Sequence, residues 1–108
     1  MKGTYLKFYF HENRKHNHWL AYEWLLDQAR KMGIHGGSAF RAIAGFGRDG
    51  ELTEDRLSGL RGDMPVEVVF AVSDEEAERF VALLRAEKLS LFYIKMPIEF
   101  GVVEGAGH

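Results

Sequence analysis

Alternation of apolar and polar side chains predicts four β-strands. In residues 4–11, TYLKFYFH, large apolar side chains occupy every second position, which is the period of an extended backbone. Residues 37–46, 64–72 and 91–100 show the same tendency. Pro97 lies within the last of these stretches, and proline has no N–H to donate to a neighbouring strand. We therefore expect the last strand at an edge of the sheet, or with a bulge near Pro97.

Two segments between these strands change to the period of an α-helix. From His18 onward, apolar residues recur three and four positions apart, with Asn17 as the expected N-cap and Gly33 as the residue that ends the helix. The second helix follows Ser73, which forms a capping-box pattern with Glu76. The positions expected to face the core are Tyr22, Leu25, Leu26, Ala29, Met32, Ala77, Phe80, Val81 and Leu84.

The order β-α-β-β-α-β predicts an α+β, ferredoxin-like sandwich. In such a fold a four-stranded antiparallel sheet carries both helices on one face. We expect a single domain over residues 1–108, with its core at about 4–101 and a frayed tail at 102–108. The strands place large apolar side chains on both faces, although the helices cover only one. Because monomers rarely expose a large apolar patch, the second face predicts self-association.

Composition restricts the classes of function. The 108 residues include no cysteine, so disulfides, thiolate catalysis and cysteine metal sites are excluded. The net charge of −2 does not favour a nucleic-acid partner or an anionic membrane. No apolar run approaches the ~20 residues of a membrane span, and the N-terminus has no signal-peptide pattern. These features predict a soluble, cytoplasmic protein.

Three glycines at positions 45, 47 and 50 follow the second strand with the spacing G-x-G-x-x-G. In a dinucleotide-binding enzyme a helix would begin directly after this turn. Here the following residues, ELTEDRLSGLRGD, have no helical period. We instead predict a long connecting loop over about residues 47–63, of a length that is usually functional or disordered. Gly45 and Gly47 would let the backbone turn and come close to another group at its base.

Several motifs together resemble the family catalogued as domain of unknown function 190, a branch of the PII-like signalling proteins. The motifs are RAIAGFG at 41–47, Tyr22-Glu23 ahead of Gly33-Ile34, Asp63-x-Pro65, and VFAVSDEE at 69–76. The resemblance covers about residues 5–101 and implies a ferredoxin-like trimer closed by its sheets, with a flexible T-loop between strands two and three. It also implies that an effector such as an adenine nucleotide binds between subunits near the T-loop base. The loop would then dock on a transporter, channel or enzyme.

Carried onto this sequence, the resemblance implies two groups of functional residues. The effector-binding residues are Arg41, Gly45, Phe46, Gly47 and Asp63, and the partner-binding loop contains Arg48, Asp49, Glu51, Glu54, Asp55, Arg56 and Arg61. Arg41 shares a strand face with Ala39 and Ile43, and we expect it on the open, subunit-facing side, holding either an anion or an intersubunit salt bridge.

One connection departs from the PII pattern. PII proteins hold phosphates with a glycine-rich, lysine-containing turn after the second helix, whereas residues 85–91, RAEKLSL, contain one lysine and no glycine. ATP binding, an altered ligand and a different mode of nucleotide binding all stay open.

Two alternatives come from other classes of protein. His11, His16 and His18 have a spacing that suits a metal ion, as in a trimeric metal-tolerance protein of CutA type. A small enzyme with its site in the same cleft is the third hypothesis. The chain has no nucleophile elbow, no Walker loop and no local histidine–carboxylate pattern, so we predict a regulatory protein rather than an enzyme.

Overall fold

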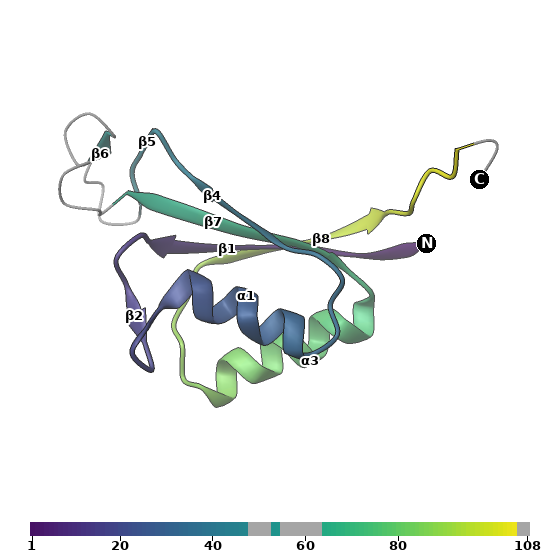
Figure 1. Cartoon of the computed structure of the whole chain (residues 1–108), viewed down its shortest axis with the longest axis horizontal. Coiled ribbons are helices and arrows are strands. Elements are labelled where there is room, and N and C mark those ends of the chain that lie inside the picture. Colours follow the sequence, from purple (N-terminus) through teal and green to yellow (C-terminus); the bar gives the residue numbers. More distant parts are fainter. Residues whose placement is uncertain (48–52, 55–63, 106–108) are drawn as a thin grey trace.

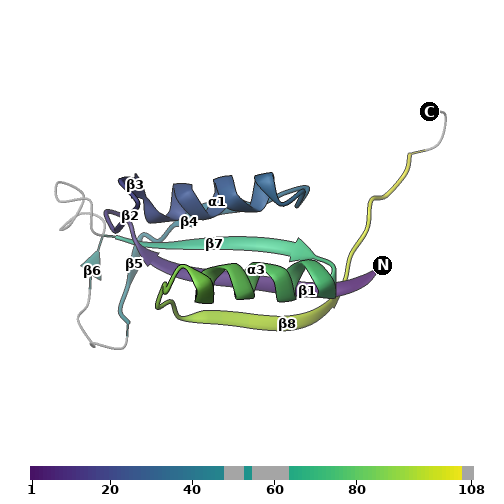
Figure 2. The same cartoon turned by 90° about the horizontal axis from the view of Figure 1, so that it is seen from below.

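The computed structural model describes residues 1–47, 53–54 and 64–105. Its main sheet has the strand order β4-β7-β1-β8 and is antiparallel throughout. The strands are β1 (Lys2–His11), β4 (Ser38–Arg41), β7 (Pro65–Val72) and β8 (Tyr93–Glu99). Helices α1 (Ala21–Lys31) and α3 (Asp74–Ala86) lie on the same face of the sheet, as Figures 1 and 2 show. The predicted ferredoxin-like sandwich is confirmed.

The first helix starts later than the sequence predicted. Asn17 is not its N-cap, because Asn17 and His18 have φ values of 50° and 68° and form the turn of a small hairpin. The hairpin joins β2 (Lys15–His16) to β3 (Trp19–Leu20), and α1 follows Leu20 directly. Asparagine suits both a helix cap and a left-handed turn residue, so the local pattern did not distinguish the two.

The other predicted helix boundaries are confirmed. Gly33 has a φ of 86° just beyond the C-cap of α1. At the start of α3, the Glu76 amide donates to the Ser73 hydroxyl at 3.1 Å, and the Ser73 amide donates to the Glu76 carboxylate at 2.9 Å. This reciprocal pair satisfies two backbone donors that the helix itself leaves without partners. None of the helices in the described ranges is long and apolar enough to cross a membrane.

The second predicted strand is interrupted. β4 ends at Arg41, and the chain then forms β5 (Ala44–Gly45), which pairs with β6 (Thr53–Glu54) outside the main sheet. The last strand, β8, pairs only with β1 within the main sheet, so Pro97 lies on an edge strand as predicted. Val102 and Val103 follow it and are 84% and 96% exposed.

The core lies between the sheet and the two helices. Phe8 packs edge-to-face against Phe80 of α3 at a centroid distance of 5.7 Å, and Phe70 packs the same way at 5.1 Å. Such aromatic pairs add to the stabilisation that burial alone provides. Of the predicted core positions in the helices, Leu25, Ala29, Ala77, Phe80 and Leu84 are buried, whereas Tyr22, Leu26, Met32 and Val81 are partly buried against the core.

The opposite face of the sheet has no helix over it (Figure 1). Phe40, Phe92 and Met96 are 58%, 51% and 46% exposed. Phe40 is the register partner of Glu67, and Met96 that of Tyr5, which places both on the side opposite the buried Val66 and Val68. We call this surface the open face.

Candidate functional site

Three segments that are distant in sequence meet at one end of the sheet. β1 ends there, β4 ends there, and β7 begins there after the predicted loop. The Glu12 amide donates to the Met64 carbonyl at 2.9 Å, and the Ala42 amide donates to the Pro65 carbonyl at 2.8 Å. These two hydrogen bonds fix the residues after β1 and after β4 against the first residues of β7. The β2–β3 hairpin and the β5–β6 pair lie at the same end (Figure 1).

Arg41 lies at this end of the sheet, but not on the face that the sequence suggested. It is the register partner of Val66, whose side chain is buried on the helix side. The expectation that Arg41 points to the open face is therefore wrong. The large residue of β4, Phe40, faces outward instead, and the alanines beside Arg41 gave no indication of which side was buried.

The guanidinium of Arg41 forms an ion pair within the same chain. Its Nε donates to Oε2 of Glu12 at 2.9 Å, and the two side chains are 37% and 24% exposed. An arginine at a partly exposed site suits planar oxyanions, because its guanidinium presents several donors in a fixed plane. Sequence reasoning did not single out Glu12, because it precedes Arg41 by 29 residues and belongs to no local motif.

The second oxygen of Glu12 has an unusual environment. Oε1 is buried and has no hydrogen-bond partner among the residues that the structure describes. Tyr22, at the start of α1, lies close enough for its pKa to respond: burial raises the pKa above its ordinary value, and the negative charges of Glu23 and Glu12 raise it further. Glu12 thus carries a negative charge in a partly desolvated setting with only one oxygen paired.

The glycines of the AGFG segment have no special backbone conformation. Gly33 has a positive φ, whereas Gly45 and Gly47 do not. A Cβ added to Gly45 would make an ordinary contact with Pro65 at 3.6 Å, and one added to Gly47 would meet no atom within 4 Å. Phe46 between them is 72% exposed. The chain's own geometry does not require glycine at position 47, so any requirement would come from a group outside this protomer.

The predicted effector residue Asp63 lies outside the described residues. So do the predicted partner-binding residues Arg48, Asp49, Glu51, Asp55, Arg56 and Arg61. Glu54 is placed in the short strand β6.

The N-terminal histidines do not converge. His16 Nε2 lies 2.9 Å from Oε1 of Glu87, and its ring packs edge-on against Trp24 at 4.4 Å, whereas His11 and His18 are exposed. Over residues 1–47, 53–54 and 64–105, no group of three potential metal ligands occurs. The metal-binding alternative therefore gains no support from these residues.

The β2–β3 hairpin is fastened to the connection between α3 and β8. Besides the contact between His16 and Glu87, Arg14 donates to the Ser90 carbonyl at 2.9 Å, and Asn17 donates to Glu87 at 3.3 Å. Lys88 in this connection has a φ of 58°, a left-handed conformation that usually favours glycine. The connection that lacks the PII glycines is therefore a tight helix end covered by the hairpin.

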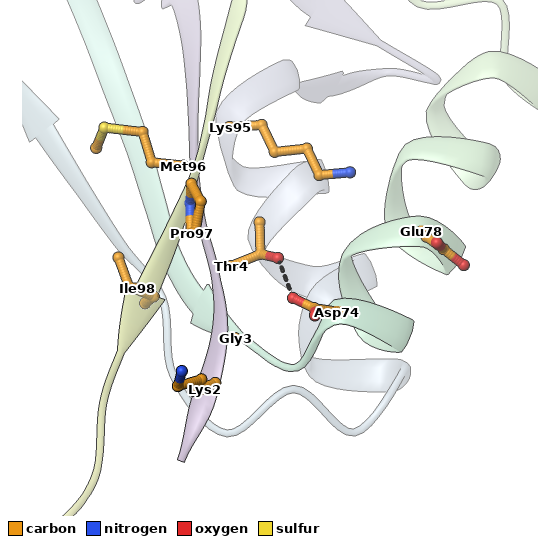
Figure 3. A pocket seen from close by; sticks show the side chains of 9 residues that line it. All are labelled: Lys2, Gly3, Thr4, Asp74, Glu78, Lys95, Met96, Pro97 and Ile98. Carbon is orange, nitrogen blue, oxygen red and sulfur yellow. Dashed lines mark hydrogen bonds between the residues drawn. The ribbon is translucent and has the colours of Figure 1, made fainter.

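A separate hollow lies at the other end of the sheet, where β1 and α3 begin (Figure 3). It has a volume of about 510 Å³ and includes two lysines and two acidic residues among its lining. The Thr4 hydroxyl donates to Oδ1 of Asp74 at 2.6 Å across its inner side. This bond satisfies the hydroxyl of Thr4, a polar side chain buried in the sheet.

The fold and the site end define the class of PII-like proteins. Solved structures of a nitrogen regulatory PII-like protein, CPII from Thiomonas intermedia K12, superpose with a TM-score of 0.70 at 18% identity, covering 94% of this chain and 91% of that one. That protein is bound to ADP, AMP and bicarbonate. A PII-like signalling protein from Thermus thermophilus gives 0.65 at 16% identity, covering 90% of this chain and 87% of the other.

The sequence itself is more specific. Residues 3–90 match the family DUF190, described as Uncharacterized ACR, COG1993, and the chain belongs to this family. A UPF0166 protein of Aquifex aeolicus (strain VF5) is 32% identical over 74 residues, which are 68% of this chain and 70% of the relative. The resemblance drawn from the RAIAGFG segment and the strand-to-helix passage is thereby confirmed.

Proposed function

We propose that this chain is a trimeric, cytoplasmic regulatory protein of PII type rather than an enzyme. It senses a small anionic effector, in the first place an adenine nucleotide, in clefts between subunits. The uncovered apolar sheet face carries this proposal. Phe40, Phe92 and Met96 expose about half of their surfaces there, which a second and third copy of the sheet would cover.

The effector site lies where the predicted loop joins the sheet. A trimer closed through the open faces would bring a neighbouring subunit beside the AGFG segment. Arg41 supplies a cation for a phosphate, and the exposed Phe46 supplies an apolar surface for a flat ring. The ADP, AMP and bicarbonate bound by the structural relative CPII are ligands of this chemistry, each carrying an oxyanion.

Signalling would proceed through the loop of residues 47–63. An effector that binds better when this loop is ordered shifts the population toward the ordered state. The charged residues of the loop would then engage a transporter, channel or enzyme. Because the α3–β8 connection lacks the phosphate-binding glycines of PII proteins, the nucleotide would rely on the AGFG segment and Arg41 more than on that turn.

Thermal unfolding in the presence of ATP, ADP, AMP and bicarbonate tests the proposal. A ligand at ~100 times its dissociation constant adds about 2.7 kcal/mol to stability, which raises the melting temperature visibly. We expect one or more nucleotides to stabilise the wild type and to lose this effect in Gly47→Ala. The variant itself should fold normally, because its new Cβ meets no atom within 4 Å.

Gly36→Ala provides the matched control. Gly36 also has open space around its Cβ position and lies in the connection between α1 and β4. It should leave every ligand effect unchanged. The proposal fails if none of the four compounds stabilises the wild type, or if sedimentation shows a monomer at micromolar concentration.

A further inference from the structure

We propose that Glu12 is a charge gate for the anion site: its carboxylate occupies the Arg41 guanidinium in the ligand-free chain, and the oxyanion of the effector must displace it. This inference rests on the proposed function and adds the residue that sets the affinity of the site. The ligand chemistry is an oxyanion, whether the phosphate of a nucleotide or free inorganic phosphate.

The backbone holds the two groups in place from separate strands. Glu12 follows β1 and is fixed by its amide bond to Met64, and Arg41 ends β4, directly before the Ala42 amide that bonds to Pro65. Both bonds end on adjacent residues of the same chain segment. The 2.9 Å contact between Nε and Oε2 is therefore built into the sheet end rather than left to two mobile side chains.

The pairing leaves the carboxylate incompletely satisfied. Only Oε2 faces the guanidinium Nε, while Oε1 is buried without a hydrogen-bond partner in the described part of the chain. A buried acceptor without a donor is unfavourable, so the ion pair is weaker than a carboxylate with both oxygens bonded. Glu12 is thus suited to hold Arg41 in place and to yield it to a ligand that offers a better set of acceptors.

Displacement still leaves a negative charge beside the bound anion. Like charges about 4 Å apart repel by roughly 1 kcal/mol in water and more in a partly desolvated site, which corresponds to about a tenfold change in affinity. Glu12 would therefore keep the site selective against weak anions. A ligand must add contacts beyond its charge in order to bind.

Isothermal titration of the full-length protein with ADP, inorganic phosphate and adenosine tests this role. In Glu12→Gln, which keeps the side-chain shape and removes the charge, we expect ADP to bind about tenfold more tightly. Adenosine has no phosphate, so its binding should not change. Arg41→Gln should weaken ADP binding, and Glu12→Ala should tighten it like the glutamine variant, which separates the effect of charge from that of packing.

Asp27→Asn is the matched charge control. Asp27 is paired with Arg30 at 2.7 Å and Lys31 at 3.0 Å on α1, and its loss changes the net charge from −2 to −1, as the loss of Glu12 does. It should leave ADP affinity unchanged.

The outcomes separate the gate from the proposed function. If ADP binds the wild type, but equally or less tightly to both Glu12 variants, the gate is refuted and the sensor stands. The gate is refuted as well if Arg41→Gln binds ADP like the wild type. If phosphate alone gains affinity in Glu12→Gln, the gate stands and the nucleotide assignment fails. If neither ADP nor phosphate binds any variant, both proposals fail.

Discussion

Replacing Phe40 with serine should dissociate the proposed trimer while leaving each protomer folded. Phe40 is 58% exposed on the open face. A phenylalanine offers about 200 Å² of surface, so association would bury about 115 Å² of this residue. At ~25 cal/mol per Å² that burial contributes about 3 kcal/mol per protomer, or about 9 kcal/mol for three copies. A loss of this size lowers the association constant roughly a million-fold, since each 1.4 kcal/mol is tenfold.

Sedimentation equilibrium measures the effect directly. For three protomers in equilibrium with a trimer, the midpoint concentration varies with the square root of the constant, so it should rise about a thousand-fold. The wild type should sediment at three times 12.3 kDa, about 37 kDa, and Phe40→Ser at 12.3 kDa. Trp19→Ser is the control, because Trp19 is 49% exposed but lies in the hairpin on the helix side. A Phe40→Ser protein that stays trimeric at micromolar concentration would refute the assignment of the open face.

Three further predictions concern stability, each measured by urea unfolding in the Phe40→Ser background. Ser73→Ala removes the capping box of α3 and should lower the free energy of unfolding by about 1 kcal/mol. Lys88→Gly relieves a left-handed lysine and should raise it by about 0.5–1 kcal/mol. The hydrogen bond to Glu67 raises the pKa of Lys7, so this pair stabilises the fold below the unfolded lysine pKa of about 10.4 and is lost as the pH rises through the raised value. Glu67→Gln should therefore flatten the loss of stability above about pH 10, by about 0.2–1 kcal/mol because both side chains are partly exposed.

The periodic parts of the fold could be predicted from the sequence because burial repeats with the backbone. The alternation in β1 and β7 gave the core face directly, and the capping box at Ser73 marked the start of α3 to the residue. The β2–β3 hairpin was missed because Asn17 and His18 adopt positive φ, which asparagine tolerates without any further mark in the sequence.

The candidate site was only partly predictable. The RAIAGFG segment identified the region, and Arg41 does lie at the end of the sheet. Its direction was predicted wrongly because β4 is an edge strand whose large residue, Phe40, faces away from the helices. Glu12 could not be found from local patterns, because its relation to Arg41 arises only when β1 and β4 are both placed beside β7.

The position of Met64 and Pro65 gives the proposed sensor a short route from ligand to loop. These two residues follow the predicted loop directly, and their carbonyls accept the amides of Glu12 and Ala42. Met64 is fully buried, so the return of the loop into the sheet is fixed by packing as well as by hydrogen bonds. An oxyanion that moves Glu12 away from Arg41 would act on the residues that hold this return point. The coupling between effector and loop then needs no path through the core, because both bear on the same two hydrogen bonds at the end of the sheet.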